Sequence, residues 1–308
     1  MQRHIAPASL KSEAETRELS GLASGLVGVV IFGLTLPMTH IALAGFDRYF
    51  IGIGRAIPAA LLAALILAIT RQPVPSLENW GRLAVVSIGC IFGFPLFVTA
   101  AMEQVPAAHG GVILAVLPLA TAMAGALMDG ERPSLSFWLT GVAGSLLVLA
   151  FAMTEAGGFT FQAGDLLLVA ATIAAAVGYG QSGVLARTIG GWQAISWALV
   201  LSLPFSVLAV LLFAGPVNWH APADAWLGFA YVSLMSQFFG FFFWNRGMAL
   251  AGTAKTGQLQ LLQPFVTLVA SYFLLSEAVG WRHAGFALAV VVIVALGRQL
   301  RVERTQTA

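Results

Sequence analysis

The sequence predicts an all-α, polytopic membrane protein whose ten transmembrane helices form two inverted five-helix repeats. Three observations predict this fold class: an apolar composition, a regular alternation of apolar stretches with charged or turn-forming residues, and self-similarity at one fixed offset. Of the 308 residues, 59% are hydrophobic and only 9% are charged, whereas soluble domains carry about 25% charged residues. Each apolar stretch of about 20 residues is therefore expected to cross the hydrocarbon core of a bilayer.

Ten such stretches follow one another, separated by loops rich in charge, glycine or proline. Residues 1–20 are polar and mixed in charge, without the apolar core of a signal peptide, and we interpret them as a cytoplasmic tail. Residues 302–308 form the expected C-terminal tail. The expected spans are approximately 22–44, 49–69, 83–102, 107–128, 135–153, 164–186, 194–214, 225–245, 254–276 and 283–300.

The basic residues predict the orientation of these spans. Twelve of the 15 lysines and arginines lie in the two tails or in alternate loops on one side of the membrane, and Arg48 and Arg282 lie on the other side. Cytoplasmic loops carry the excess of basic residues. Both termini are therefore expected in the cytoplasm, beneath a bacterial inner membrane.

An internal repeat appears when the chain is aligned with itself at an offset of 146 residues. Identical residues then meet from the first span to the last, among them Gly45 with Gly191 and Pro58 with Pro204. The predicted repeats are residues 21–157 and 158–301. Because each contains five spans, an odd number, the second must lie upside down relative to the first. Inverted repeats are typical of secondary transporters.

Both repeats share one pattern in their second halves. Small residues open the fourth span of each repeat, a proline follows within it, and a glutamate stands 13 residues later, as Pro118 with Glu131 and Pro264 with Glu277. With this pattern the chain resembles the drug/metabolite transporter superfamily in its EamA-like form, and bacterial exporters of aromatic amino acids in particular. The resemblance implies a ten-helix carrier of small metabolites. The second copy lacks an arginine after its glutamate, so no role of Arg132 carries over to it.

Polar side chains recur along one face of the ninth span. Gln260 and Gln263 belong to this stripe, which Pro264 interrupts by removing an amide donor. A polar face on a weakened helix can line an aqueous cavity, and we expect Gln260 and Gln263 to do so. Gln258 is a further candidate on a different face. The alternative is that these amides form hydrogen bonds between helices.

Other spans supply further candidates for substrate binding. Tyr179 and Gln237 lie deep in the sixth and eighth spans, and Trp244 and Asn245 follow toward the end of the eighth. Trp244 could instead mark the membrane interface, where tryptophan gathers. His40, in the first span, could bind a substrate or a neighbouring backbone carbonyl.

A second group of residues is expected to act in gating or structure. Arg55 is the one charge clearly inside a span. We expect its side chain to extend toward the outer interface of the membrane. Alternatively, it could bind backbone carbonyls or a substrate carboxylate. The glutamates mark equivalent positions on opposite sides of the membrane, and the prolines are candidate hinges. The group is Pro37, Arg55, Pro118, Glu131, Pro264 and Glu277.

The sequence therefore favours a secondary transporter that exports small metabolites, most of all amino acids that are aromatic or otherwise large and neutral. No carboxylate stands mid-membrane, which favours facilitated diffusion or exchange over proton coupling. Carriers of nucleotide sugars or phosphates are the alternative, but they need several converging basic residues. An intramembrane enzyme would need paired aspartates or a zinc set, and a non-transporting scaffold fits the polar stripes poorly. Cys90 is the single cysteine, so no thiolate metal site can be built from it. We also expect no other metal, no cofactor and no nucleic acid. A monomer in the lipid bilayer should suffice for transport.

Overall fold

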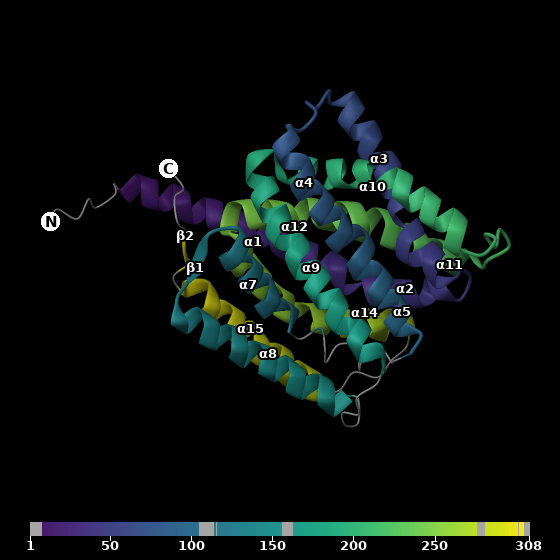
Figure 1. Ribbon diagram of the computed structural model, residues 1–308. Coiled ribbons are helices and arrows are strands. Elements are labelled where there is room, and N and C mark those ends of the chain that lie inside the picture. Colours follow the sequence, from purple (N-terminus) through teal and green to yellow (C-terminus); the bar gives the residue numbers. More distant parts are fainter. Residues whose placement is uncertain are drawn as a thin grey trace.

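The computed structural model describes residues 8–104, 114, 116–155, 163–275, 281–300 and 302–304, which are almost entirely helical. The helices form an elongated bundle in which most of them run along its length (Figure 1). The start of helix α1 and the short strand β2 lie at the same end of this bundle, on the left of Figure 1.

The first repeat contains, in order, α1 (Ala8–Gly33), α2 (Thr35–Leu43), the π-helical segment η1 (Phe50–Gly54), α3 (Ala56–Ile69), α4 (Leu77–Val86), the π-helical segment η2 (Ser87–Gly93), α5 (Phe94–Met102), α7 (Leu117–Met128), β1 (Glu131–Pro133) and α8 (Leu135–Glu155). The second repeat contains α9 (Ala163–Thr188), α10 (Gly191–Phe213), α11 (Ala223–Ala230), the π-helical segment η3 (Tyr231–Gly240), α12 (Phe241–Ala251), α13 (Thr253–Gln258), the 3₁₀ segment η4 (Leu259–Leu262), α14 (Gln263–Leu275), α15 (Trp281–Gln299) and β2 (Val302–Arg304).

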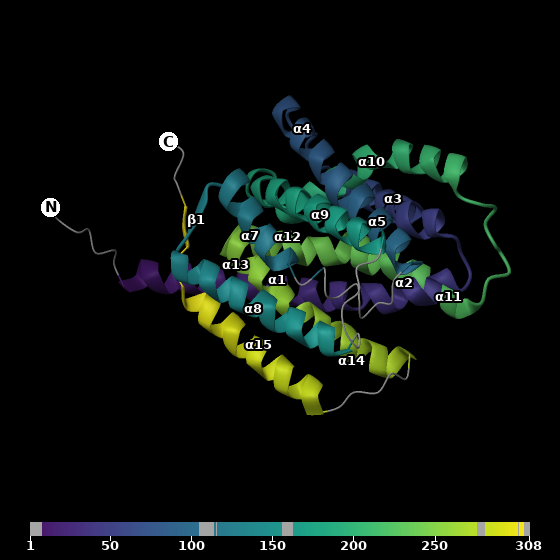
Figure 2. The same ribbon diagram turned by 60° about the horizontal axis from the view of Figure 1, so that its bottom comes forward.

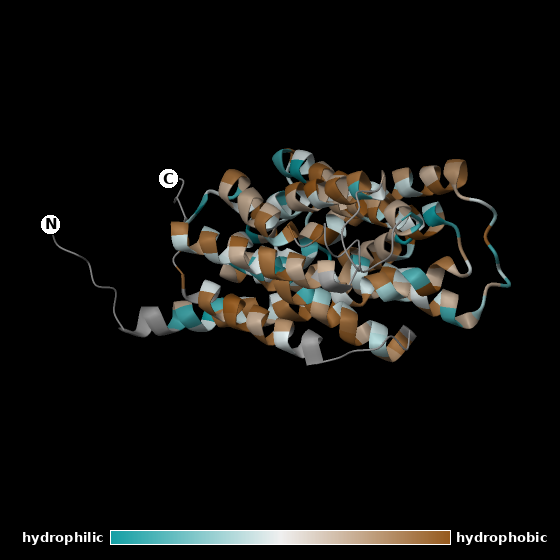
Figure 3. Cartoon of the chain, turned by 90° about the horizontal axis from the view of Figure 1, so that it is seen from below, coloured by the Kyte–Doolittle hydropathy of each residue, from teal (hydrophilic) through white to brown (hydrophobic). Residues whose placement is uncertain are grey.

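Six helices in the described part of the chain are long and apolar enough to cross a membrane. They are Glu13–Leu43, Phe50–Ile69, Leu77–Met102, Ala163–Thr188, Gly191–Phe213 and Ala223–Ala251. Shorter apolar helices cover Leu117–Met128, Leu135–Phe151 and Leu288–Gly297. These segments fall within or overlap the expected spans, and the count of ten spans stays a prediction. Figure 3 shows hydrophobic residues along most of the length of the helices.

Both ends of the chain differ from the simple tails that the sequence predicted. Helix α1 begins at Ala8, inside the expected N-terminal tail, and continues without interruption into the first span. Residues 302–304 form β2, which pairs antiparallel with β1, so that Glu131 is opposite Arg304. This small sheet joins the end of the second repeat to the loop between α7 and α8 in the first.

Prolines determine where several helices begin. Pro37, Pro118 and Pro264 all stand in the first turn of a helix, where a missing backbone N–H is tolerated. Because Pro37 cannot donate to the carbonyl one turn earlier, the carbonyl of Gly33 needs another donor. Thr267 Oγ1 of α14 donates to it at 2.7 Å. The break in the first span is therefore stabilised by the second repeat.

Helix packing follows the division into two repeats. Helix α1 packs along α12, and their equivalents at the 146-residue offset, α9 and the η2–α5 segment, also pack together. Helices α3 and α10, α7 and α13, and α8 and α15 pair across the two repeats, and Figures 1 and 2 both show α8 beside α15. The π-helical segments η2 and η3 occupy equivalent positions as well, since adding 146 to Ser87 gives Ser233.

Glycines allow the closest of these approaches. A Cβ atom added to Gly247 of α12 would lie 2.9 Å from the Cα of Gly25 in α1 and 3.1 Å from the carbonyl oxygen of Gly21. Small residues four apart let membrane helices approach closely. The α1–α12 contact is thus a backbone-to-backbone interface that tolerates no side chain at Gly247.

Candidate functional site

A buried cavity lies where α1, α2, α5, α9 and η3 meet, and both repeats contribute to its wall. The space open to the centres of water molecules inside it is about 30 Å³, enough for about two waters. A larger molecule must therefore widen the cavity to enter it. Its polar lining consists of Thr35, Thr39, Arg55, Thr99, Tyr179, Ser236 and Gln263.

Arg55 is the charged member of this lining. It caps the π-helical segment η1 at the start of α3, and only 4% of its surface is exposed. Its Nε donates to Oε1 of Gln237 at 2.8 Å, and Nε2 of Gln237 donates to the Cys90 carbonyl at 3.3 Å. The predicted extension of Arg55 toward the outer interface is therefore wrong, because the side chain turns inward and is held between the repeats.

Three π-helical segments meet at this hydrogen-bonded chain. Arg55 follows η1, Cys90 lies in η2 and Gln237 lies in η3. Segments of π-helix are frequent at functional sites, because the wider turn re-aims side chains and disturbs the regular hydrogen-bond ladder. Here the result is a polar link across the centre of the bundle.

Aromatic rings and hydroxyl groups complete the wall. Thr35 Oγ1 and Ser236 Oγ lie 2.9 Å apart, and either can donate to the other. Phe32 and Phe241 meet edge to face with ring centroids 5.2 Å apart, and Tyr179 lies 6.0 Å from Phe241. The cavity thus offers one cation, several hydroxyl groups and apolar ring surface.

Trp244 supports this wall without lining it. The side chain is fully buried, and its ring lies 5.5 Å from that of Tyr179 and 6.1 Å from that of Phe32. Of the other residues predicted to bind substrate, Tyr179 and Gln263 line the cavity, and Gln237 contacts Arg55.

Asn245, Gln258 and Gln260 are not among the residues that line this cavity, and their part in substrate binding stays a prediction. Asn245 accepts from Ser182 Oγ at 2.9 Å and donates to the Gly191 carbonyl at 3.1 Å. Gln260 accepts from Thr121 Oγ1 at 3.0 Å. Gln258 is buried, with its amide beside Gly297 of α15. Asn245 and Gln260 thus form hydrogen bonds between helices, which was the alternative for Gln260.

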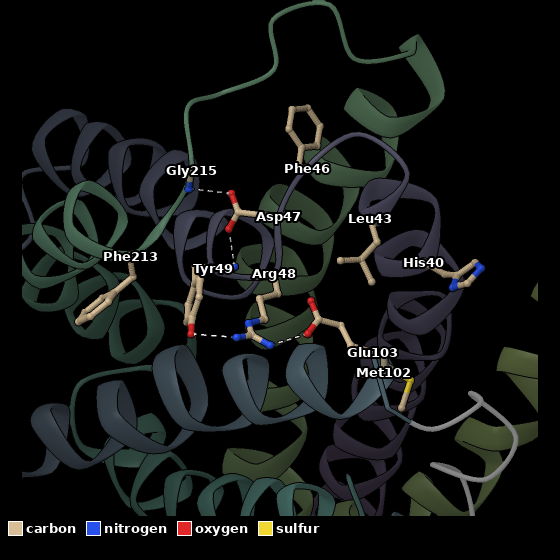
Figure 4. A pocket seen from close by; sticks show the side chains of 10 residues that line it. All are labelled: His40, Leu43, Phe46, Asp47, Arg48, Tyr49, Met102, Glu103, Phe213 and Gly215. Atoms are coloured by element: carbon tan, nitrogen blue, oxygen red, sulfur yellow. Dashed lines mark hydrogen bonds and ion pairs between the residues drawn. The ribbon is translucent and has the colours of Figure 1, made fainter.

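His40 lies in a vestibule above the cavity. The volume of the vestibule that is open to the centres of water molecules is about 520 Å³. His40 and Met102 line it. In the sequence they follow the cavity residues Thr39 and Thr99, respectively, by about one helical turn or less. Figure 4 shows His40 exposed at the rim, pointing away from the other polar groups. The vestibule and the cavity are therefore lined by neighbouring residues of α2 and α5.

The floor of the vestibule contains an ion pair. Arg48 donates to Glu103 at 2.6 Å and to the Tyr49 hydroxyl at 3.2 Å (Figure 4). The hydrogen bond and charge of Glu103 raise the pKa of Arg48, which keeps the guanidinium protonated. Asp47 accepts from the backbone N–H groups of Tyr49, Phe50 and Gly215 and so holds the surrounding loop.

The opposite end of the bundle is closed by contacts between the repeats. Both oxygens of Glu131 accept backbone N–H groups, from Thr253 and Ala254, each at 2.7 Å. Asp129 accepts from Thr253 Oγ1 at 3.1 Å and forms an ion pair with Arg187. Glu131 is only 3% exposed. We name these side chains, Asp129, Glu131, Arg187 and Thr253, the end lock. Glu277, the predicted counterpart of Glu131, lies outside the described residues.

Sequence reasoning missed several members of the site. Thr35 and Thr39 stand four residues apart in the first span, a spacing that places them on one helix face and could have identified them. Thr99 gave no comparable signal. The end lock could be foreseen only in part, because Asp129 and Arg187 are 58 residues apart in the chain and meet through the packing of α7 on α9.

Comparisons with known proteins agree with this architecture. The chain is 43% identical over 281 residues to the uncharacterized transporter YdeK of Bacillus subtilis (strain 168), covering 91% of this chain and 97% of the relative. It is 26% identical over 254 residues to the aromatic amino acid exporter YddG of Ancylobacter novellus, covering 81% and 83% of the two chains. A crystal structure with 21% sequence identity has the same fold, with a TM-score of 0.70 over 91% of this chain and 96% of that one.

The model of the EamA-like transporter family matches the chain twice, at residues 19–154 and 162–297. The two matches correspond to the two repeats, although the exact boundaries at residues 157 and 158 stay a prediction. The chain belongs to the EamA-like transporter family, within the drug/metabolite transporter superfamily, and is a multi-pass membrane transporter.

Proposed function

We propose that this protein exports amino acids, aromatic or otherwise large and neutral, across a bacterial inner membrane. The observation that carries the proposal is the cavity between the repeats, which combines hydroxyl groups, aromatic rings and one arginine. Hydroxyl and amide groups suit a zwitterion, and aromatic rings suit a large apolar side chain. The name of the exporter from Ancylobacter novellus supports the same cargo.

Transport is proposed to proceed by alternating access. In this proposal the vestibule is the entrance at one end of the pathway, and the end lock closes the other end. By the distribution of basic residues the vestibule faces outward, and both termini face the cytoplasm. Exchanging the conformations of two inverted repeats would close the vestibule and open the lock. The helix breaks at Pro37, Pro118 and Pro264 are the proposed hinges.

We further propose that the substrate gradient, by facilitated diffusion or exchange, drives transport. No carboxylate lines the cavity in the part of the chain that the structure describes, so none is placed to carry a proton with the substrate. A nucleotide-sugar or phosphate-ester carrier is less well supported. Arg55 is the single cation in the described lining, and phosphate groups favour several.

Counterflow in proteoliposomes tests the proposal. Vesicles containing the purified protein and loaded with unlabelled phenylalanine should accumulate external labelled phenylalanine, without an imposed pH gradient, whereas protein-free vesicles should not. Failure to exchange phenylalanine, tryptophan, tyrosine, leucine or methionine would refute the cargo. Accumulation that requires a pH gradient would refute the proposed driving force.

A further inference from the structure

Arg55 is a buried cation for which the surrounding residues provide a hydrogen-bond acceptor but no negative charge. Its hydrogen-bond partner is the neutral amide of Gln237. Arg48, Arg187 and Lys255 form ion pairs with carboxylates in the described part of the chain, and Arg55 is in none of these pairs. Burying a charge inside a membrane protein is costly, and such residues usually pair with one another or mark a substrate pathway.

The geometry leaves most of the guanidinium available. An arginine side chain has five N–H donors, and Nε is the one that bonds to Gln237. Arg55 also lines the cavity. A planar guanidinium matches a carboxylate well, because two parallel charge-assisted hydrogen bonds can form. The missing negative charge can therefore come from a molecule in the cavity.

We propose that Arg55 binds the carboxylate of the transported molecule, so that a carboxylate is the feature that the cavity recognises first. The proposal rests on the proposed transport function and names the substrate class. The substrate is a small carboxylic acid whose remaining part is apolar or aromatic, and neutral amino acids are one such group. An amine without the carboxylate is a poor substrate.

Gln237 is a positioning residue in this arrangement. It is fully buried, and its amide is fixed at both ends, by Arg55 and by the Cys90 carbonyl. The guanidinium is thereby held in one orientation by π-helical segments of both repeats. Binding energy is larger when the recognising group needs no reorganisation.

The rest of the cavity provides weaker selection. Hydroxyl groups of Thr35 and Ser236 can accept hydrogen bonds from an ammonium group, but they already contact each other at 2.9 Å. The rings of Phe32 and Phe241 favour an apolar side chain. The ammonium group of an amino acid should therefore contribute less to affinity than its carboxylate.

Competition binding to the purified full-length protein tests this order of importance. Labelled phenylalanine is the ligand, and its competitors are 3-phenylpropionate, which lacks the ammonium group, and phenethylamine, which lacks the carboxylate. We expect 3-phenylpropionate to compete within about 10-fold of phenylalanine, and phenethylamine to be weaker by about 100-fold or more. At 1.4 kcal/mol for each factor of ten, 100-fold corresponds to about 2.8 kcal/mol. Equal competition by phenethylamine would overturn the proposal.

Variants test the assignment to Arg55. Arg55→Gln should abolish phenylalanine binding, and Arg55→Lys should retain part of it, because lysine keeps the charge without the planar fork. The matched control is Arg82→Gln, since Arg82 makes a comparable bond to Gln181, at 3.0 Å, away from the cavity. Wild-type affinity in Arg55→Gln would refute the assignment. If that variant does not fold, Arg55→Lys and the competition series still decide.

The same measurements separate this inference from the proposed function. If phenylalanine neither binds nor exchanges, but 3-phenylpropionate raises the melting temperature of the wild type and not of Arg55→Lys, the amino acid assignment fails and the carboxylate site stands. If phenylalanine and phenethylamine exchange equally well, the transport function stands and the carboxylate site fails. If neither acid binds or stabilises the wild type, the carboxylate site is wrong.

Discussion

The end lock gives the most quantitative prediction. Glu131→Gln keeps the size of the side chain but replaces one oxygen by an NH₂ group, which cannot accept from a backbone N–H. The two bonds from Thr253 and Ala254 are short, at 2.7 Å, and buried. Hydrogen bonds to charged groups contribute about 1.5–3 kcal/mol each. Losing one and weakening the other should destabilise the locked state by about 2–4 kcal/mol.

This change should shift the balance between the two open states. At about 1.4 kcal/mol for each factor of ten, 2–4 kcal/mol corresponds to a shift of about 30-fold to 700-fold toward the state that is open at the lock. Because the vestibule must close as the lock opens, the two ends should respond in opposite directions. Transport that is limited by opening of the lock should become faster.

Cysteine labelling at the two ends measures this shift. In a Cys90→Ala background, Thr256→Cys reports on the lock end, where Thr256 is fully buried, and His40→Cys reports on the exposed vestibule rim. Glu131→Gln should raise the labelling rate at residue 256 and lower it at residue 40. The matched control is Glu78→Gln, since Glu78 is exposed. Unchanged rates at both reporters would show that the lock does not control opening.

Three further substitutions test the site and its framework. Gln237→Glu places a competing carboxylate 2.8 Å from Arg55 Nε and should weaken phenylalanine binding at least about 10-fold. The control Gln181→Glu should leave phenylalanine binding unchanged, and equal effects of the two variants would contradict the role of Gln237. Asn245→Ala removes two hydrogen bonds and should lower the stability by about 1–3 kcal/mol, as measured by melting in detergent. The KM of transport should stay unchanged, and an altered KM would place Asn245 in the binding site. Gly247→Val forces a side chain against the backbone of α1 and should cost about 3 kcal/mol or more, so an unchanged melting temperature would contradict the packing.

The sequence predicted the helical framework well because the forces behind it are local. Apolar stretches of membrane-spanning length and the glycine and proline residues between them suffice to locate helices. The repeat also follows from sequence alone, and its equivalent π-helical segments, around Ser87 and Ser233, agree with the 146-residue offset. The helix that begins at Ala8 was missed because its first turns are polar.

The site was harder to predict because it depends on which way each side chain points. The stripe along the ninth span assumed one continuous α-helix, but η4 has the tighter 3₁₀ turn. This turn does not explain the divergence, because residues three apart eclipse in a 3₁₀ helix; Gln260 accepts from Thr121 of α7, while Gln263 lines the cavity. Arg55 follows a π-helical turn, whose wider period no hydropathy pattern reveals. Its inward direction became visible only with Gln237 beside it.

A structure of the wild-type protein with bound phenylalanine would show whether Arg55 binds the substrate carboxylate. We predict that the ligand lies in the cavity between the repeats, with its carboxylate within hydrogen-bond distance of the Arg55 guanidinium and its ring beside Phe32 and Phe241. A ligand whose carboxylate lies away from Arg55, or one that occupies only the vestibule near His40, would contradict it.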